Sequence, residues 1–337
     1  MSSKRIKLRD MLPLAKPLSL FMEPTNRCNF RCVMCGHGNE NTRNDAKPFV
    51  DMDFNLFCEI ITDMKNWEGA KLKLLRLAGL GEPMLHKQLP DMIKFVKDAN
   101  ITERVDMFSN GSLLTSDMAN ALIDSGLDAI RFSIYAADKE NHVRVTSQSR
   151  TSPEDILNNI RFLRKLRDEG GGGHPYIFVK MFDAYGPEND LFRSMYQDVA
   201  DEFDIEKVHN ATSYNENDLI GAFYGEGTQK AETESAYNNV TSDAKSCPRP
   251  FMALCIDSLG NVLMCTHDWP RYTKIANLNN QTIRDVWNGD ELFEFRKMQL
   301  EGRLHENKLC KNCTWFKLFP KEDNVDGFPF EKLPRGC

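Results

Sequence analysis

Short apolar runs alternate with helically spaced apolar residues along the first two thirds of the chain. The runs predict six strands, at 18–22, 72–77, 105–108, 129–134, 176–181 and 205–208. Helices fit between them, for example from Thr115 or Ser116, from Ser152 and over 191–203. Strand–helix units in this order predict a parallel sheet with helices outside. Six units are fewer than the eight that close a barrel, so the expected α/β fold is a partial (β/α)6 TIM-like barrel.

The pattern changes after the sixth strand. Polar and small residues without periodicity fill 210–246, which we interpret as a linker or substrate flap. A compact unit is then expected over 247–317, with a hairpin (251–256 and 262–265) and helices near 283–287 and 292–300. The predicted organisation is therefore a barrel at 17–209, a linker at 210–246, a small domain at 247–317 and a C-terminal tail at 318–337.

Composition and charge narrow the class of protein. The 337 residues are 41% hydrophobic and 27% charged, as in a globular protein with an ordinary core. The formal net charge of -6 argues against nucleic acid or an anionic membrane as partner. No apolar run approaches the ~20 residues that span a bilayer, and the N-terminal segment lacks a secretory signal. We therefore expect a cytoplasmic protein.

Seven of the ten cysteines fall into two spaced sets, which in the cytoplasm indicate metal rather than disulfides. Cys28, Cys32 and Cys35 form a C-x3-C-x2-C array directly after the first strand. Three thiolates leave one position of a four-iron cluster open to a ligand. A zinc knuckle completed by His37 also fits this loop.

The second set is spread over the C-terminal unit. Cys247 opens Cys-Pro-Arg-Pro-Phe, Cys265 ends the hairpin, and Cys310 and Cys313 form a C-x2-C pair. Four thiolates can ligate a second cluster fully, or they can form a zinc ribbon. Cys255 lies outside both sets, on a predicted strand; it is expected to be buried packing, a ligand or a hydrogen donor.

Two groups of motifs resemble a known family. The stretch Glu-Pro-Thr-Asn-Arg-Cys28-Asn-Phe-Arg-Cys32-Val-Met-Cys35 and the later Gly79-Leu-Gly-Glu-Pro resemble the radical S-adenosylmethionine (radical SAM) superfamily, although Met34 replaces a common aromatic residue. The Cys-Pro-x-Pro segment, the Gly-Asn-Val turn before Cys265 and the final C-x2-C resemble its SPASM or shorter twitch extension.

The resemblance implies the cofactors and their ligands. Cys28, Cys32 and Cys35 would hold one [4Fe–4S] cluster, and Cys247, Cys265, Cys310 and Cys313 would hold one auxiliary [4Fe–4S] cluster. S-adenosylmethionine (SAM) would bind at the ends of the second to fourth strands and in the segment that follows. The residues implied there are Gly79, Gly81, Glu82, Ser109, Asn110, Ser133 and Arg144.

The reaction implied is reductive cleavage of SAM to a 5′-deoxyadenosyl radical, which removes a hydrogen atom from a substrate. An external electron donor such as flavodoxin or ferredoxin would supply the electron. The first hypothesis is oxidation of a small polar substrate, a sugar or aminocyclitol alcohol, with the auxiliary cluster as electron acceptor. Lys180, Asp183 and Asp268 are candidate bases near strand or hairpin ends.

Three other functions stay open. An epimerase would need a hydrogen donor, for which Cys255 is the candidate. A SPASM-type peptide maturase would act on a peptide substrate. A binding module that holds a cluster or zinc without catalysis is the alternative outside the enzymes.

Overall fold

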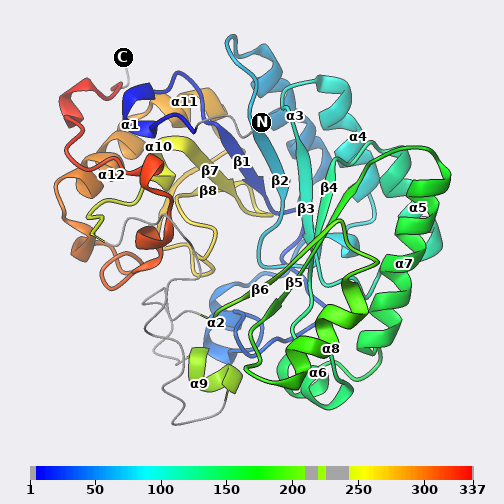
Figure 1. Ribbon diagram of the computed structural model, residues 1–337. Coiled ribbons are helices and arrows are strands. Elements are labelled where there is room, and N and C mark those ends of the chain that lie inside the picture. The colour runs from blue at the N-terminus through cyan, green and yellow to red at the C-terminus, as the bar shows by residue number, and fades with distance from the viewer. Residues whose placement is uncertain (1–4, 209–218, 225–242, 336–337) are drawn as a thin grey trace.

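The computed structural model describes residues 5–208, 219–224 and 243–335, and its strands form one sheet in the order β6-β5-β4-β3-β2-β1-β7-β8-β9. Figure 1 shows this sheet curving through the molecule. Its strands are β1 (Ser19–Met22), β2 (Leu74–Leu77), β3 (Val105–Ser109), β4 (Ala129–Ser133), β5 (Tyr176–Phe182), β6 (Glu202–Glu206), β7 (Ala253–Ile256), β8 (Asn261–Leu263) and β9 (Lys274–Asn277).

The described helices are α1 (Leu8–Met11), α2 (Glu40–Asp45), α3 (Phe54–Asn66), α4 (Leu89–Ala99), α5 (Ser116–Asp124), α6 (Lys139–Thr146), α7 (Pro153–Glu169), α8 (Pro187–Tyr196), α9 (Leu219–Tyr224), α10 (Arg249–Met252), α11 (Ile283–Asn288) and α12 (Asp290–Leu300). Short 3-10 turns are η1 (Pro83–Leu85), η2 (Leu304–Glu306), η3 (Trp315–Leu318), η4 (Lys321–Asp323) and η5 (Phe330–Lys332). None of the helices in the described ranges is long and apolar enough to cross a membrane.

The six predicted parallel strands are confirmed. β1 to β6 pair in chain order, each parallel to the next, and the sheet ends in free edges instead of closing. Helices α3, α4, α5, α7 and α8 cover its outer face (Figure 1). The expected partial barrel is therefore the fold of the first two thirds of the chain.

Local sequence explains why these helices form where they do. Asp53 accepts hydrogen bonds from the first free N–H groups of α3, and Ser152 and Asp155 form a capping box at the start of α7. The apolar stripe of α3, with Phe57 and Ile61 fully buried, packs into the main core. Capping and burial therefore specify the same helices.

Two predicted boundaries are wrong. The helix expected over 191–203 ends at Tyr196, and Phe203 belongs to β6, where it pairs with Val179 and packs against the ring of Phe192. The hairpin expected from 251 begins at 253, because residues 249–252 form α10. Proline is well tolerated in the first turn of a helix, because its backbone angle is already helical and its missing N–H would have no partner there. Pro250 therefore favours α10 at this position.

The C-terminal unit extends the barrel sheet. β7 pairs parallel to β1 along its whole length, and β8 and β9 continue antiparallel. The third strand, β9, was not predicted. The expected linker at 210–246 lies outside the described residues except for 219–224 and 243–246.

The two ends of the chain pack together beside this unit. Arg5 forms an ion pair with Asp323, and Leu8 shares a small core with Val325. The indole N–H of Trp287 donates to the carbonyl of Leu14. Figure 1 shows α1 next to the C-terminal segment drawn in red.

Candidate active site

The loop that carries the first cysteine set lies at the carboxyl end of β1. Its backbone is held by α6, because the N–H groups of Arg31 and Val33 donate to the carbonyls of Thr146 and Val145. The three thiols are within electrostatic reach of one another: burial raises the pKa of Cys28 to about 12, and the nearby charges of Glu82 and Cys35 reinforce the shift. Burial likewise raises the pKa of Cys32, with contributions from Cys35 and Cys28. Thiolates here therefore need a positively charged centre.

The four thiols of the C-terminal unit form a second buried group. Burial raises the pKa of Cys310 to about 12, and the charges of Cys247 and Cys313 add to it. Burial also raises the pKa of Cys265, and the charge of Cys247 adds to the shift. Distant segments of the unit thus bring four thiols to one place.

Backbone N–H groups point at these sulfur atoms. The N–H of Phe30 donates to Cys28 Sγ at 3.4 Å, and the N–H of His267 donates to Cys265 Sγ at 3.4 Å. N–H···S bonds of this kind surround iron–sulfur clusters and tune their potentials. The residues present therefore fit cluster binding.

A zinc site fits less well. Among the residues that the structure describes, no group of three His, Cys, Asp or Glu side chains could hold a single metal ion. A four-iron cluster keeps its thiolates further apart than one zinc ion does, because each thiolate binds a different iron. His37 is also committed elsewhere, since its Nε2 bonds to the carbonyl of Asn26 at 3.0 Å.

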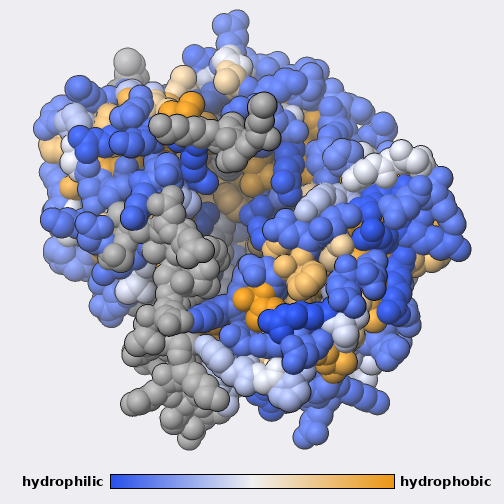
Figure 2. Space-filling model, viewed as in Figure 1, coloured by the Kyte–Doolittle hydropathy of each residue, from blue (hydrophilic) through white to orange (hydrophobic). Residues whose placement is uncertain are grey.

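One large cavity connects the two thiol groups. It measures about 660 Å³, and its lining includes Cys35 from the first set and Cys265 from the second. Gly79 and Ser133 line it too, at the ends of β2 and β4. Figure 2 shows this face of the molecule hollowed near its centre, with hydrophobic residues visible inside a largely hydrophilic rim. A molecule in this cavity would lie between both sets of cysteines.

The glycines after β2 are required by packing. A Cβ on Gly79 would lie 2.3 Å from Oε2 of Glu23, and one on Gly81 would lie 2.0 Å from the carbonyl oxygen of Thr25. The segment after β2 therefore sits directly against the start of the cysteine loop. The resemblance implies that Gly79 and Gly81 bind SAM; the structure shows that both also lie close to other parts of the chain.

Glu82, Ser109 and Asn110 are brought together as expected, at the ends of β2 and β3. The Glu82 carboxylate accepts hydrogen bonds from Ser109 Oγ (2.9 Å), Asn110 N (2.8 Å) and Met84 N (3.1 Å). Burial raises the pKa of Glu82 to about 7, although these three hydrogen bonds lower it. Asn110 Nδ2 donates in turn to Asn29 of the cysteine loop at 3.0 Å. The network therefore ties the cysteine loop to the ends of β2 and β3. Its three residues are not part of the lining of the large cavity.

Arg144 lies elsewhere. It is in the last turn of α6, and its guanidinium donates to the carbonyl of Phe223 in α9 (2.8 Å) and to Asn141 Oδ1 (3.1 Å). Ser133, by contrast, faces the cavity and hydrogen-bonds the side chain of Tyr135. The structure thus places Ser133 but not Arg144 on the cavity wall.

The candidate bases differ in their hydrogen-bond partners and in whether they line the cavity. Lys180 lines the cavity and donates to Glu206 at 2.6 Å. Both carboxylate oxygens of Asp268 hold the following turn, by accepting from the N–H groups of Tyr272 and Thr273. Asp183 accepts from Tyr185 N and Asn189 Nδ2 in the loop after β5. Lys180 and Asp268 therefore both line the cavity, whereas Asp183 does not, and both oxygens of Asp268 already accept backbone hydrogen bonds.

Cys255 is buried and lines the same cavity, on β7 opposite Phe21 of β1. Its side chain hydrogen-bonds that of Arg249, whose guanidinium is close to the auxiliary thiols. Arg249 was not predicted as a site residue, although it lies inside the Cys-Pro-Arg-Pro motif.

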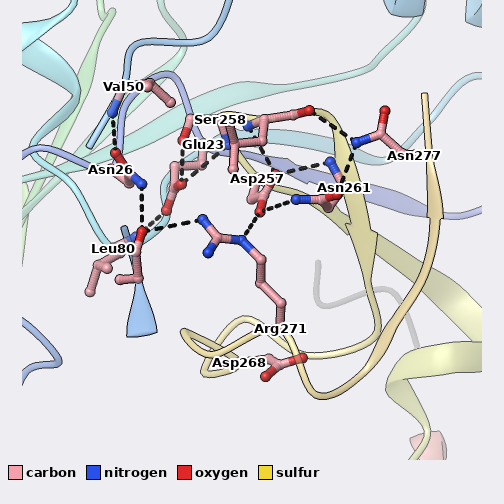
Figure 3. Close-up of polar contacts among 12 residues, drawn as sticks. Glu23, Asn26, Val50, Leu80, Asp257, Ser258, Asn261, Asp268, Arg271 and Asn277 are labelled. Atoms are coloured by element: carbon pink, nitrogen blue, oxygen red, sulfur yellow. Dashed lines mark hydrogen bonds and ion pairs between the residues drawn. The ribbon is translucent and has the colours of Figure 1, made fainter. Parts of the chain in front are cut away.

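Glu23 was missed as well. Its Oε2 accepts from Leu80 N (2.6 Å), and its Oε1 accepts from Ser258 N (3.2 Å) and Ser258 Oγ (3.0 Å). Figure 3 shows it joining β1 to the turn after β7, beside the ion pair of Arg271 with Asp257. The signal was its position directly after the first strand, inside the stretch already quoted for its cysteines.

An open parallel barrel with a cysteine triad after its first strand, and four more thiols in an extension of its sheet, defines a class of proteins with two iron–sulfur clusters. Comparison with known families agrees: residues 22–178 match the radical SAM superfamily, and residues 247–314 match the SPASM iron–sulfur cluster-binding domain. The chain belongs to the radical SAM superfamily and carries a C-terminal SPASM domain. These domains imply SAM and two [4Fe–4S] clusters.

Two curated relatives show the range of the similarity. The tungsten-containing aldehyde ferredoxin oxidoreductase cofactor-modifying protein of Pyrococcus furiosus is 32% identical over 48% of this chain, and the match spans only 42% of that protein. The S-adenosyl-L-methionine-dependent 2-deoxy-scyllo-inosamine dehydrogenase of Niallia circulans is 23% identical over 87% of this chain and 91% of its own length.

Solved structures share the fold. BtrN in complex with AdoMet and 2-DOIA aligns with a TM-score of 0.54 at 18% identity, covering 89% of this chain and 93% of BtrN. Streptococcus suis SuiB bound to precursor peptide SuiA aligns with a TM-score of 0.62 at 14% identity, covering 91% of this chain and 73% of SuiB.

Proposed function

We propose that this chain is a radical SAM dehydrogenase that oxidises an alcohol of a small polar substrate, a sugar or aminocyclitol, to a ketone. The observation that carries the proposal is that one cavity is lined by both Cys35 and Cys265. A substrate held there would lie next to the place of hydrogen abstraction and next to a second redox centre. The full-length similarity to a SAM-dependent inosamine dehydrogenase supports the same reaction class.

The ligand sets follow from the two thiol groups. Cys28, Cys32 and Cys35 would hold the SAM-binding cluster, and Cys247, Cys265, Cys310 and Cys313 would hold the auxiliary cluster. When bound, SAM and the first cluster supply the 5′-deoxyadenosyl radical that removes a hydrogen atom, and the auxiliary cluster supplies an acceptor for the second electron. An external donor such as flavodoxin or ferredoxin belongs to the same proposal.

The protein's own residues orient the cofactor and handle the proton. Gly79 and Ser133 would contact SAM directly, while Gly81, Glu82, Ser109 and Asn110 would fix the shape of its pocket, Gly81 by packing against the cysteine loop and the other three through their shared hydrogen bonds. Oxidation of a secondary alcohol removes one hydrogen atom from carbon, one proton from oxygen and one electron. The Lys180–Glu206 pair on the cavity wall is the proposed acceptor for that proton.

The test is anaerobic reconstitution followed by SAM cleavage. Two four-iron clusters require about eight iron atoms per chain. With dithionite and SAM the protein should release 5′-deoxyadenosine, and a panel of sugars and aminocyclitols should include one that is converted to a ketone. Zinc in place of iron, or no 5′-deoxyadenosine, would overturn the proposal.

One observation favours epimerisation as a second candidate: the buried Cys255 thiol faces the cavity and could return a hydrogen atom to a substrate radical. In deuterated water an epimerase would place deuterium on carbon, whereas the dehydrogenase would not. Cys255→Ala would abolish turnover only in the epimerase. Cys58→Ala on α3, outside the cavity lining, is the matched control.

A further inference from the structure

Guanidinium groups and phenyl rings alternate along the inner wall of the barrel, one strand after another. Phe21 on β1 is in register with Arg76 on β2, and Arg131 on β4 is in register with Phe108 on β3 and Phe178 on β5. The Arg131 guanidinium lies 5.3 Å from the ring centre of Phe108 and 4.3 Å from that of Phe178. All five residues line the large cavity.

The cations of this wall differ in their partners. Arg76 forms two hydrogen bonds of 2.6 Å with the carboxylate of Asp106, and Lys180 donates to Glu206. Arg131 has neither a hydrogen bond nor an ion pair with any residue in the described part of the chain. Two carboxylates, Glu206 and Asp106, are near enough for their charge to act on Arg131. They already form ion pairs with Lys180 and Arg76.

An unpaired cation inside a cavity is costly unless something else neutralises it. Burial lowers the pKa of Arg131, and the neighbouring Arg76 lowers it further, so the wall itself disfavours this charge. The other acids of β6, Glu202 and Asp204, also line the cavity; they are exposed at the edge of the sheet, and neither forms an ion pair with Arg131. Arg131 therefore faces the cavity without a carboxylate bound to it.

We propose that Arg131 binds an oxyanion, a carboxylate or phosphate group, carried by the substrate. The rings of Phe108 and Phe178 flank the guanidinium of Arg131. Its N–H groups can therefore donate only from the edge of the guanidinium plane, where two of them match the two oxygens of a carboxylate or phosphate. This inference rests on the proposed function and narrows it, because an acidic or phosphorylated sugar is favoured over a cationic aminocyclitol. SAM also carries a carboxylate, but Arg131 lies two residues, about 7 Å along the strand, before Ser133.

The experiment uses the cluster-loaded protein with SAM and measures the binding of inorganic pyrophosphate and of citrate by calorimetry. One of the two probes should bind, which also tells phosphate from carboxylate. Arg131→Gln should weaken that binding about tenfold or more, and Arg131→Lys should weaken it less, because it keeps the charge and loses the fork. Arg161→Gln, the same change on the exposed side of α7, should leave binding unchanged.

The affinity for SAM, measured separately, should stay within about threefold of the wild type in every variant. Equal probe binding in the wild type and Arg131→Gln, or no binding of either probe to the wild type, would overturn the proposal. Loss of SAM affinity in step with probe affinity would overturn it too, by assigning Arg131 to SAM. If Arg131→Gln retains less iron than the wild type, the comparison of probe binding is made between the wild type and Arg131→Lys instead. Release of 5′-deoxyadenosine without substrate tests the proposed function independently.

Discussion

Glu23 offers a sharp test of how the SPASM unit is joined to the barrel. Its buried carboxylate accepts one hydrogen bond from the end of β2, through Leu80, and two from Ser258 after β7. Glu23→Gln keeps the shape of the side chain but replaces one acceptor oxygen with an NH₂ group. At least one buried N–H is then left without an acceptor, which costs about 1–3 kcal/mol.

The charge of Glu23 acts in the opposite direction. Burial raises its pKa to about 7, an effect that the Leu80 hydrogen bond opposes and the charge of Asp257 reinforces. A carboxyl group whose pKa is higher in the folded protein stabilises it fully below the unfolded pKa of about 4.5, and this stabilisation is lost as the pH rises through 7. Between pH 6 and pH 8 the wild type should lose about 1 kcal/mol that the glutamine variant does not lose.

The assay is thermal unfolding of cluster-loaded protein, anaerobically and at one scan rate, at pH 6, 7 and 8. The variant should be clearly less stable than the wild type at pH 6. The difference should shrink by about 1–2 °C at pH 8, the shift expected for this energy in a chain of this size. Glu82 titrates over the same range but is present in both proteins, so it cancels.

Glu59→Gln, the same change on the exposed face of α3, is the control and should match the wild type at each pH. Parallel pH profiles for the wild type and Glu23→Gln would refute the reasoning. Equal stability at pH 6 would show that the hydrogen bonds to Leu80 and Ser258 do not hold the junction.

Three further predictions concern the clusters and the core. Arg249→Gln should shift the midpoint potential of the auxiliary cluster to a more negative value, since a nearby guanidinium favours the reduced state; an unchanged potential in an EPR-monitored titration would contradict this. Trp287→Ala should destabilise the protein by about 3–5 kcal/mol, because the ring is 1% exposed, and urea unfolding measures it. Asn110→Ala should speed the loss of iron to a chelator by freeing Asn29 of the cysteine loop, whereas the exposed Asn120→Ala should not.

Much of the barrel could be predicted because its local signals agree with its tertiary contacts. Apolar runs, capping residues such as Ser152 and the turn at Gly126, which has a φ of 79°, all indicated the same elements. The errors occurred where a contact distant in sequence decides. Phe203 fits a helical pattern equally well, and only its pairing with Val179 makes it part of a strand.

The candidate site divides in the same way. Cysteine spacing predicted both thiol sets that the structure gathers, because thiolates have few other uses at such spacing. The partners of Arg144 and Asp268 could not be predicted, since each depends on where α9 or a turn packs. Arg131 carried one weak signal, its two-residue spacing from Ser133 on a strand, which places both side chains on one face of the sheet.

The sequence alone therefore determined the strand–helix order, the two cysteine sets and the class of cofactor, all properties of short segments with strong chemistry. Only the tertiary structure decided that β7 continues the barrel sheet beside β1, so that Cys35 and Cys265 open into one cavity. It also decided that Arg131 faces that cavity without a carboxylate bound to it. Such features depend on side chains from several strands meeting in space, and no local pattern encodes which strands will be neighbours.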